Sequence, residues 1–255
     1  MTQRLIKSHF SSSLHPSFCT PLANFWPWPM HWRDVHLVAY RFAPQDFSVQ
    51  DPEACNITMP PTLQSAARKR QAEFLAGRLC ARGALHKFDP SLAAPGIDID
   101  GAPFWPDSYV GSISHSNGYA AAIAAPRQRY MGIGIDIERK LTLLEASEIS
   151  YEILTTSERR HLGKSKTDSS EAFIASAFSL KESLFKALYP SIKQRLDFKE
   201  MEITHWDRSG QASLRVNPGQ GLQWLSPYRF DAYFNWVNDL IFSVVAIEKI
   251  PSAPS

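Results

Sequence analysis

The chain has 255 residues, of which 44% are hydrophobic and 20% are charged, and its formal net charge is +2. No run of about eighteen apolar residues could span a bilayer and no apolar signal segment follows the N-terminus, so we expect a cytoplasmic protein that contacts no membrane. The small net charge argues against a protein that coats nucleic acid, and three cysteines without metal-ligand spacing argue against a disulfide framework.

The first half of the chain predicts an extended arm, one long helix and several short strands. Residues 1–32 have no clear hydrophobic period and predict the arm. Apolar residues at helical spacing predict a long amphipathic helix over 62–88. The expected strands are 35–42, 110–114, 119–125 and 131–137. Turn residues separate the last three strands, which predicts a small antiparallel meander.

The second half repeats this order of elements. A short helix is expected around 158–161, and a long helix over 171–189 is expected to end at Pro190. The expected strands are 197–206, 212–216, 228–234 and 240–247. We therefore predict an α+β fold with a pseudo-two-fold duplication, in which each of two lobes packs a long helix on a small antiparallel sheet. The predicted units are the arm at 1–32, an N-terminal lobe at 33–132, a C-terminal lobe at 133–250 and a tail at 251–255.

Two carboxylates, Asp136 and Glu138, follow the apolar alternation of 132–137. Residues two apart on a strand project from the same face, so these two side chains lie side by side. Their mutual repulsion favours a cation between them, and hard oxygen ligands favour magnesium or calcium. A solvated edge strand that uses its acids to deter aggregation is the alternative.

A second candidate feature is the predicted helix over 171–189, where Glu182 and Lys186 are four residues apart and share a face. Pairs at this spacing commonly form exposed ion pairs that contribute little to stability. This helix, however, is apolar around most of its circumference, so its charged side chains are expected to be partly shielded from water. Shielded charges need a specific partner or a function.

Two further features predict contacts with anions. Ser114 and His115 end a predicted strand and could bind a phosphate, although a turn-capping serine and a core histidine explain them equally well; no nucleophile elbow supports a hydrolase. The first long helix is strongly basic, with Glu73 as its one acid. Arg70 and Arg78 are eight residues apart and so lie on nearly one face, where both could bind one polyanion. A solvated basic face is the alternative.

In combination these motifs resemble those of the 4'-phosphopantetheinyl transferase superfamily. The pattern G-I-D-x-E at 134–138, followed by an aromatic residue and K-E-S-x-x-K-A at 178–187, is its signature. Three upstream segments resemble the two-lobed branch of surfactin-type and enterobactin-type enzymes: E-F-L-A-G-R at 73–78, G-x-P-x-W-P at 101–106 and S-I-S-H-S at 112–116. Residues 17–21 and 178–190 are most similar to the broad-specificity pseudomonad type, which serves carriers of fatty acid and secondary metabolism.

The resemblance implies a reaction and a role for each matching residue. The enzyme would transfer the 4'-phosphopantetheine arm of coenzyme A to a serine of an apo acyl, peptidyl or aryl carrier protein and release adenosine 3',5'-bisphosphate. The implied site comprises Asp136, Glu138 and Glu182 as Mg²⁺ ligands, Glu182 as general base, Lys181 and Lys186 on phosphate oxygens with Lys186 also catalytic, Ser114 and His115 on coenzyme A phosphates, and Arg70 and Arg78 on the 3'-phosphate.

The duplication of the lobe within one chain predicts a monomer, and the sequence has one departure from the family pattern. Asp100 and Ala102 stand where many relatives have a lysine near G-x-P. Binding of the adenine-side phosphate is therefore expected to depend more on Arg70 and Arg78. Two alternatives stay open. A magnesium-dependent nucleotide hydrolase would explain the acids and the cations but not a dependence on a carrier protein. A non-catalytic module that binds coenzyme A or a carrier would not need the intact set of acids and lysines.

Overall fold

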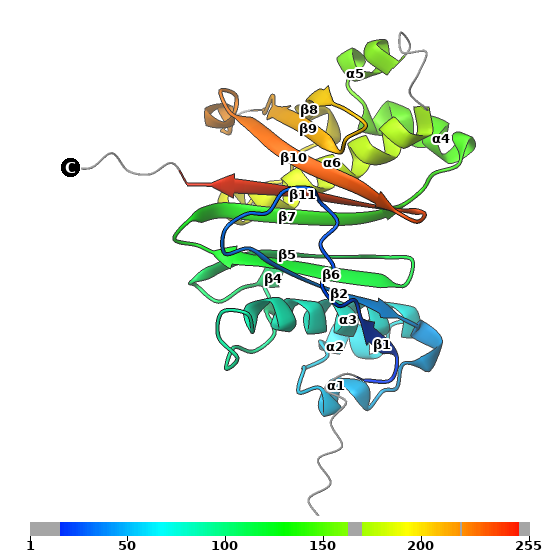
Figure 1. Cartoon of the computed structure of the whole chain (residues 1–255), viewed down its shortest axis with the longest axis vertical. Coiled ribbons are helices and arrows are strands. Elements are labelled where there is room, and N and C mark those ends of the chain that lie inside the picture. Colours follow the sequence, from blue (N-terminus) through cyan, green and yellow to red (C-terminus); the bar gives the residue numbers. More distant parts are fainter. Residues whose placement is uncertain (1–15, 163–169, 220, 250–255) are drawn as a thin grey trace, which may run out of the picture.

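The computed structural model describes residues 16–162, 170–219 and 221–249. These residues form two lobes, each with a long helix against an antiparallel sheet, as Figure 1 shows. The strands are β1 (Cys19–Pro21), β2 (His36–Phe42), β3 (Gly96–Ile97), β4 (Pro103–Phe104), β5 (Tyr109–Ser116), β6 (Tyr119–Pro126), β7 (Tyr130–Arg139), β8 (Met201–Trp206), β9 (Gln211–Val216), β10 (Arg229–Val237) and β11 (Leu240–Glu248). The helices are η1 (Pro44–Asp46), α1 (Asp51–Ala54), α2 (Pro61–Gln64), α3 (Arg68–Leu85), α4 (Leu143–Ile153), α5 (Thr156–Leu162), α6 (Ser170–Ile192), η2 (Phe198–Glu200) and η3 (Gln223–Leu225). None of these helices is both long and apolar enough to cross a membrane.

The N-terminal lobe packs α3 on a sheet with the strand order β1-β2-β6-β5. Its core contains many small residues, such as Ala76 on the helix and Ala122 on β6, so helix and sheet approach closely. Gly77 is part of this contact, because a Cβ added there would lie 2.8 Å from the Ile113 side chain. The turn between β5 and β6 is made by Asn117 and Gly118, both of which have positive φ.

The C-terminal lobe packs α6 on a sheet with the strand order β7-β11-β10-β9-β8. The alternation of β7 divides its residues between two environments. Ile133, Ile135 and Ile137 enter a core between the lobes. The residues between them face α6, since Gly132 and Gly134 lie against the backbone of that helix.

The lobes meet where β5 and β7 run side by side (Figure 1). These strands belong to different sheets, and serine side chains connect them. The hydroxyl of Ser112 accepts a hydrogen bond from the backbone N–H of Ile135, and that of Ser114 accepts one from Ile137, both at 3.1 Å. Buried backbone N–H groups on the unpaired edge of a sheet need hydrogen-bond acceptors. The two serine hydroxyls supply these acceptors along the edge of β7 that faces β5.

The structure confirms the α+β architecture and corrects several predicted elements. The helix predicted over 62–88 is divided into α2 and α3, because Ala67 is extended and caps a second helix. The third strand of the predicted meander, β7, pairs with β11 of the other sheet instead of with β6. Helix α6 continues through Pro190 to Ile192, although proline cannot donate the backbone hydrogen bond to the preceding turn.

Several elements were not predicted, and α4 and β1 are the ones that bear on the fold of the lobes. Helix α4 begins with a capping box, in which Thr142 and Glu145 exchange hydrogen bonds. It buries Ala146 and Ile153 in the core of the C-terminal lobe but leaves Leu143, Leu144 and Tyr151 exposed, so its apolar residues cover more than one face. Within the predicted arm, β1 pairs with β2, and Trp28 is buried with its Nε1 donating to the carbonyl of Phe242 at 3.0 Å. The predicted tail and residues 1–15 of the arm lie outside the described residues.

Candidate active site

The approach of α6 to β7 depends on two glycines of the G-I-G-I-D motif. A Cβ at Gly132 would lie 1.9 Å from the carbonyl oxygen of Ala187, and one at Gly134 would lie 1.8 Å from that of Ser183. No side chain fits at either position, so the helix rests directly on the strand backbone. The acids that follow these glycines on the same face of β7 therefore meet the next side chains of α6, Glu182 and Lys186.

Asp136 and Lys186 form an ion pair at the lobe junction. The Nζ atom of Lys186 donates to Oδ1 of Asp136 at 2.6 Å and to the Ser114 hydroxyl at 3.4 Å. The Ser114 hydroxyl in turn donates to Oδ1 of Asp136 at 3.0 Å. Asp136 is only 2% exposed, and its second oxygen, Oδ2, is buried without a hydrogen-bond partner among the described residues. A buried carboxylate oxygen of this kind calls for a further donor or a cation.

Burial raises the pKa values of two acids in the cluster, where one lysine faces three carboxylates. Burial raises the pKa of Glu138 to about 7, and the charge of Asp136 adds to the shift, while Lys186 opposes it. Burial also raises the pKa of Glu182, again opposed by Lys186 and reinforced by Asp136. One lysine therefore does not neutralise the three carboxylates, and their electrostatics fit a bound cation.

These carboxylates share one charged environment, but their side chains do not converge as a set of metal ligands. Across the described parts of the chain, no three Asp, Glu, His or Cys side chains converge as ligands of one metal ion. The structure thus brings Asp136, Glu138 and Glu182 into electrostatic contact but does not assemble them around a common point. The Oδ1 atom of Asp136 already has a cationic partner in Lys186.

His115 follows Ser114 and points to the other face of β5, where α3 lies. Its Nε2 is 3.3 Å from Nη1 of Arg70, and its Nδ1 is 3.8 Å from Oε2 of Glu73. Burial lowers the pKa of His115; Glu73 opposes this shift, and Arg70 and Lys186 reinforce it. Successive strand residues point in opposite directions, so Ser114 contacts the C-terminal lobe and the adjacent His115 contacts α3.

Arg78 occupies a different environment from Arg70, although both lie on α3. It is 6% exposed, its Nη2 donates to the carbonyl of Gly96 at 3.1 Å, and its guanidinium lies 4.7 Å from the centre of the Phe74 ring. Burial lowers the pKa of Arg78 to about 10, and its Nε has no hydrogen-bond partner among the described residues. Arg78 borders a cavity of about 350 Å³. The two arginines therefore do not form one exposed pair, as their spacing had suggested.

Lys181 does not lie with the predicted phosphate-binding residues. It is fully buried, and its Nζ donates to the carbonyls of Ile153 and Phe198 at 2.7 and 3.1 Å and to Oε2 of Glu158 at 2.8 Å. These contacts use all three donors of the ammonium group. The structure thus corrects the predicted role: Lys181 connects α4, α5, α6 and η2, and burial lowers its pKa against the opposing charge of Glu158.

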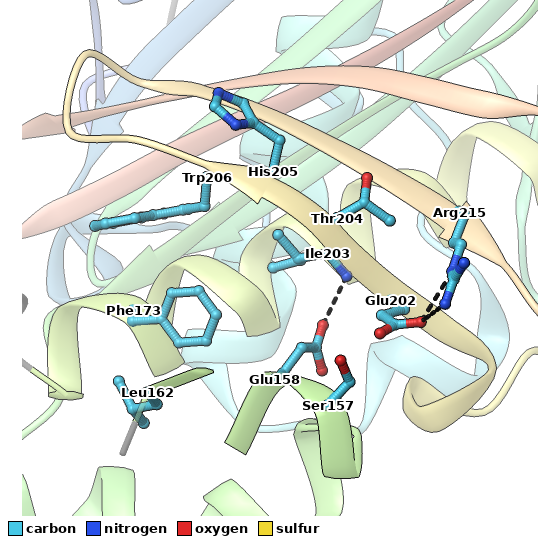
Figure 2. A pocket seen from close by; sticks show the side chains of 10 residues that line it. All are labelled: Ser157, Glu158, Leu162, Phe173, Glu202, Ile203, Thr204, His205, Trp206 and Arg215. Carbon is cyan, nitrogen blue, oxygen red and sulfur yellow. Dashed lines mark hydrogen bonds and ion pairs between the residues drawn. The ribbon is translucent and has the colours of Figure 1, made fainter. Parts of the chain in front are cut away.

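Figure 2 shows the pocket next to this buried ion pair, where Glu158 also accepts a hydrogen bond from the backbone N–H of Ile203 at 2.7 Å. The pocket has a volume of about 410 Å³ and lies between α5, α6 and the edge strand β8. Arg215 pairs with Glu202 on its wall, at 2.7 Å. None of the residues that border this pocket belongs to the Asp136 cluster, so it is separate from the candidate active site.

The sequence alone did not single out a group of contacts between the lobes. Lys193, just after α6, pairs with Asp98 at 2.7 Å and with Asp100 at 3.0 Å, and the Tyr189 hydroxyl donates to Asp100 at 2.9 Å. Asp100 is the departure from the family pattern noted above. Helical spacing was the available signal, because Tyr189 continues the face of α6 that carries Glu182 and Lys186.

Comparisons with known proteins agree along most of the chain. The family model of the 4'-phosphopantetheinyl transferase N-terminal domain matches residues 60–125, and that of the 4'-phosphopantetheinyl transferase superfamily matches residues 132–236. Enterobactin synthase component D of Salmonella typhi is 32% identical over 92% of this chain and 96% of its own length. The 4'-phosphopantetheinyl transferase Npt of Nocardia iowensis is 35% identical over 59% of this chain and 66% of its own length.

Among solved structures, a holo-(acyl-carrier-protein) synthase from Bacillus anthracis is 22% identical and has a TM-score of 0.37, covering 48% of this chain and 99% of its own. This structural likeness is low, so the assignment rests on the sequence relatives. The match to Enterobactin synthase component D extends over nearly all of both chains. The chain belongs to the 4'-phosphopantetheinyl transferase superfamily.

Proposed function

We propose that this protein transfers the 4'-phosphopantetheine arm of coenzyme A to a serine hydroxyl of an apo carrier protein and releases adenosine 3',5'-bisphosphate. Family membership supports phosphopantetheinyl transfer to carrier proteins. The observation that carries the finer proposal is the junction cluster, in which Asp136, Glu138, Glu182 and Lys186 share one electrostatic environment beside Ser114 and His115.

The proposed reaction forms one phosphorus–oxygen bond and breaks another. The serine oxygen attacks the phosphorus nearest the pantetheine, its proton leaves to a base, and the bond to the bridging oxygen of the pyrophosphate breaks. Glu182 is the base, because burial raises the pKa of its carboxylate and so makes it a better proton acceptor near neutral pH. Lys186 donates to the phosphate oxygens after exchanging its contact with Asp136, and His115 and Arg70 bind phosphate on the α3 side.

Asp136, Glu138 and Glu182 are the residues that would hold a magnesium ion. The donor chemistry fits, because the group offers hard carboxylate oxygens, the unpartnered Oδ2 of Asp136 and surplus negative charge. A bound magnesium ion would supply charge neutralisation at the pyrophosphate. Lys186 now pairs with Oδ1 of Asp136, and in this proposal its ammonium group binds a phosphate oxygen of the substrate.

The proposed partners are apo acyl, peptidyl and aryl carrier proteins, and the enzyme acts as a monomer in the cytoplasm. Carriers of siderophore assembly are first candidates, because relatives of this chain bear the name Enterobactin synthase component D. Carriers of fatty acid synthesis are the second class. A panel that contains both classes decides between a narrow and a broad specificity.

The test is incubation of the purified protein with coenzyme A, magnesium and a panel of apo carriers, followed by intact-mass measurement of each carrier. We expect a mass increase of one phosphopantetheine and an equal amount of adenosine 3',5'-bisphosphate. Release of the nucleotide without any carrier would instead indicate a nucleotide hydrolase. Binding of coenzyme A or carrier without any product would indicate a non-catalytic module.

A further inference from the structure

Glu73 is an acidic side chain within an otherwise cationic cluster. It is the single acid of α3, and its side chain is 14% exposed. Its carboxylate lies 3.6 Å from Nη1 of Arg70, 3.8 Å from Nδ1 of His115 and 4.0 Å from Nζ of Lys69. A carboxylate among groups that would bind a phosphate needs an explanation, because it competes with that phosphate for the same donors.

Helix stability does not explain this position. The pairs with Lys69 and Arg70 have the spacing of ordinary surface ion pairs, which contribute little. The face of α3 that packs on the sheet is made of Ala72, Leu75 and Ala76, and Glu73 is not among the core residues. Its contact with His115, in contrast, connects the helix to β5 across the lobe.

The contacts of His115 define its tautomer. A guanidinium only donates hydrogen bonds, so the His115 Nε2 that faces Arg70 is an acceptor and carries no proton. The ring proton is then on Nδ1, the atom that faces Glu73. The carboxylate thus keeps the ring in one orientation while it holds Arg70 beside Nε2.

We propose that Glu73 is a positioning residue for the terminal 3'-phosphate of coenzyme A, which it serves by holding Arg70 and His115 side by side. This inference rests on the function proposed above. Without Glu73, the Arg70 side chain, which is largely exposed, loses its partner on α3 and must be ordered when the ligand binds. Two donors that are already aligned lose less conformational freedom on binding a phosphate monoester.

The structure also explains why an acid is tolerated there. Lys69, Arg70 and Lys186 surround the site with positive charge, since Arg70 and Lys186 both act on His115. The cluster therefore stays attractive to a dianion despite one carboxylate. Removing that carboxylate increases the positive charge but leaves Arg70 and His115 without a common partner. Loss of the carboxylate therefore has two opposite effects on phosphate binding: the added positive charge strengthens it, and the lost alignment of Arg70 and His115 weakens it. The Glu73→Gln variant shows which effect is larger.

The experiment compares coenzyme A with 3'-dephospho-coenzyme A as donor substrates of the full-length protein, in wild type and in Glu73→Gln. We expect the KM for coenzyme A to rise about five-fold in the variant, which corresponds to the loss of one modest polar contact. The kcat and the KM for 3'-dephospho-coenzyme A should stay within about two-fold. The preference for the 3'-phosphate therefore shrinks, which a change in folding alone would not produce.

The control is Glu53→Gln, an exposed acid of the same lobe for which we expect wild-type kinetics. Arg70→Ala supplies the second test: if Glu73 acts through Arg70, adding Glu73→Gln to Arg70→Ala has a smaller effect than Glu73→Gln alone. An unchanged preference in Glu73→Gln, or equal losses with both donors, overturns the inference. Wild type that modifies no carrier from coenzyme A overturns the proposed function itself, and the inference with it.

Discussion

The two lobes share one architecture and differ in the charge that they bring to the junction. In the N-terminal lobe, α3 lies on its sheet through small residues and presents cations, among them Arg70. In the C-terminal lobe, α6 lies on β7 through glycines and presents Glu182 and Lys186 next to Asp136. The same helix-on-sheet unit thus supplies the proposed phosphate-binding cations from one copy and the carboxylates from the other.

This difference shows that neither lobe contains the candidate site alone. Ser114 and His115 are neighbours on β5, yet Ser114 contacts Asp136 of the C-terminal lobe while His115 contacts the α3 side chains. The side-by-side course of β5 and β7 is what joins the two sets. Variants that act on only one lobe, or only on the junction, should therefore have separable effects.

The largest expected effect is on the junction itself. Replacing Asp136 with alanine should reduce carrier modification at least about 100-fold, because the group loses one proposed metal ligand and the partner of Lys186. The mass-shift assay measures the loss, and circular dichroism checks that the fold is retained. Asp239→Ala, at an exposed position of the same lobe, should keep full activity. Full turnover in Asp136→Ala would contradict the metal assignment.

Two lysines of α6 should separate stability from activity. Lys181→Ala leaves Glu158 buried without its cation and should lower the free energy of unfolding by about 3–5 kcal/mol. Lys186→Ala removes a more exposed partner, so it should abolish most of the transfer and destabilise the protein less. Urea denaturation and the carrier assay measure the two quantities. Equal destabilisation by both substitutions would show that Lys186 is also mainly structural.

The glycine contact between α6 and β7 is the next test. Gly134→Ala places a Cβ against the backbone of Ser183, so we expect a loss of about 1–3 kcal/mol in unfolding free energy. Activity should fall as well, because α6 carries Glu182. The matched control is Gly96→Ala, where the nearest atom lies 4.0 Å from the added Cβ. If Gly134→Ala is as stable and active as this control, the close approach of α6 does not position the site.

The smallest expected effect is the pH dependence that Glu138 contributes to stability. Burial raises the pKa of Glu138 to about 7 in the folded protein, from its ordinary value of 4.5, so the folded state binds more protons than the unfolded chain between these values. The free energy of unfolding should therefore fall as pH rises through this window. Glu138→Gln should flatten that fall in denaturation measured without divalent cations. An identical pH profile in both proteins would contradict the predicted shift.

Regular periodicity revealed the parts of the fold and site that depend on local pattern. Strand alternation placed Asp136 and Glu138 on one face, and helical spacing placed Glu182 with Lys186. The same spacing puts Lys181 about 140° from Lys186 around the helix, so its separate environment could have been foreseen. The partner of β7 could not, because both sheets offer an antiparallel neighbour. Helix α4 was missed because its exposed Leu143 and Leu144 lie beside the buried Ala146 and Ile153, so the apolar residues do not follow one clear face.

The most direct test of the central claim is a crystal structure of the protein with coenzyme A and manganese in place of magnesium, read by anomalous scattering. We expect one manganese peak bound by Asp136, Glu138 and Glu182 next to the pyrophosphate, with Lys186 turned from Asp136 to a phosphate oxygen. A complex in which Glu182 points away from the other two acids, and no ion lies between them and the pyrophosphate, would contradict the account.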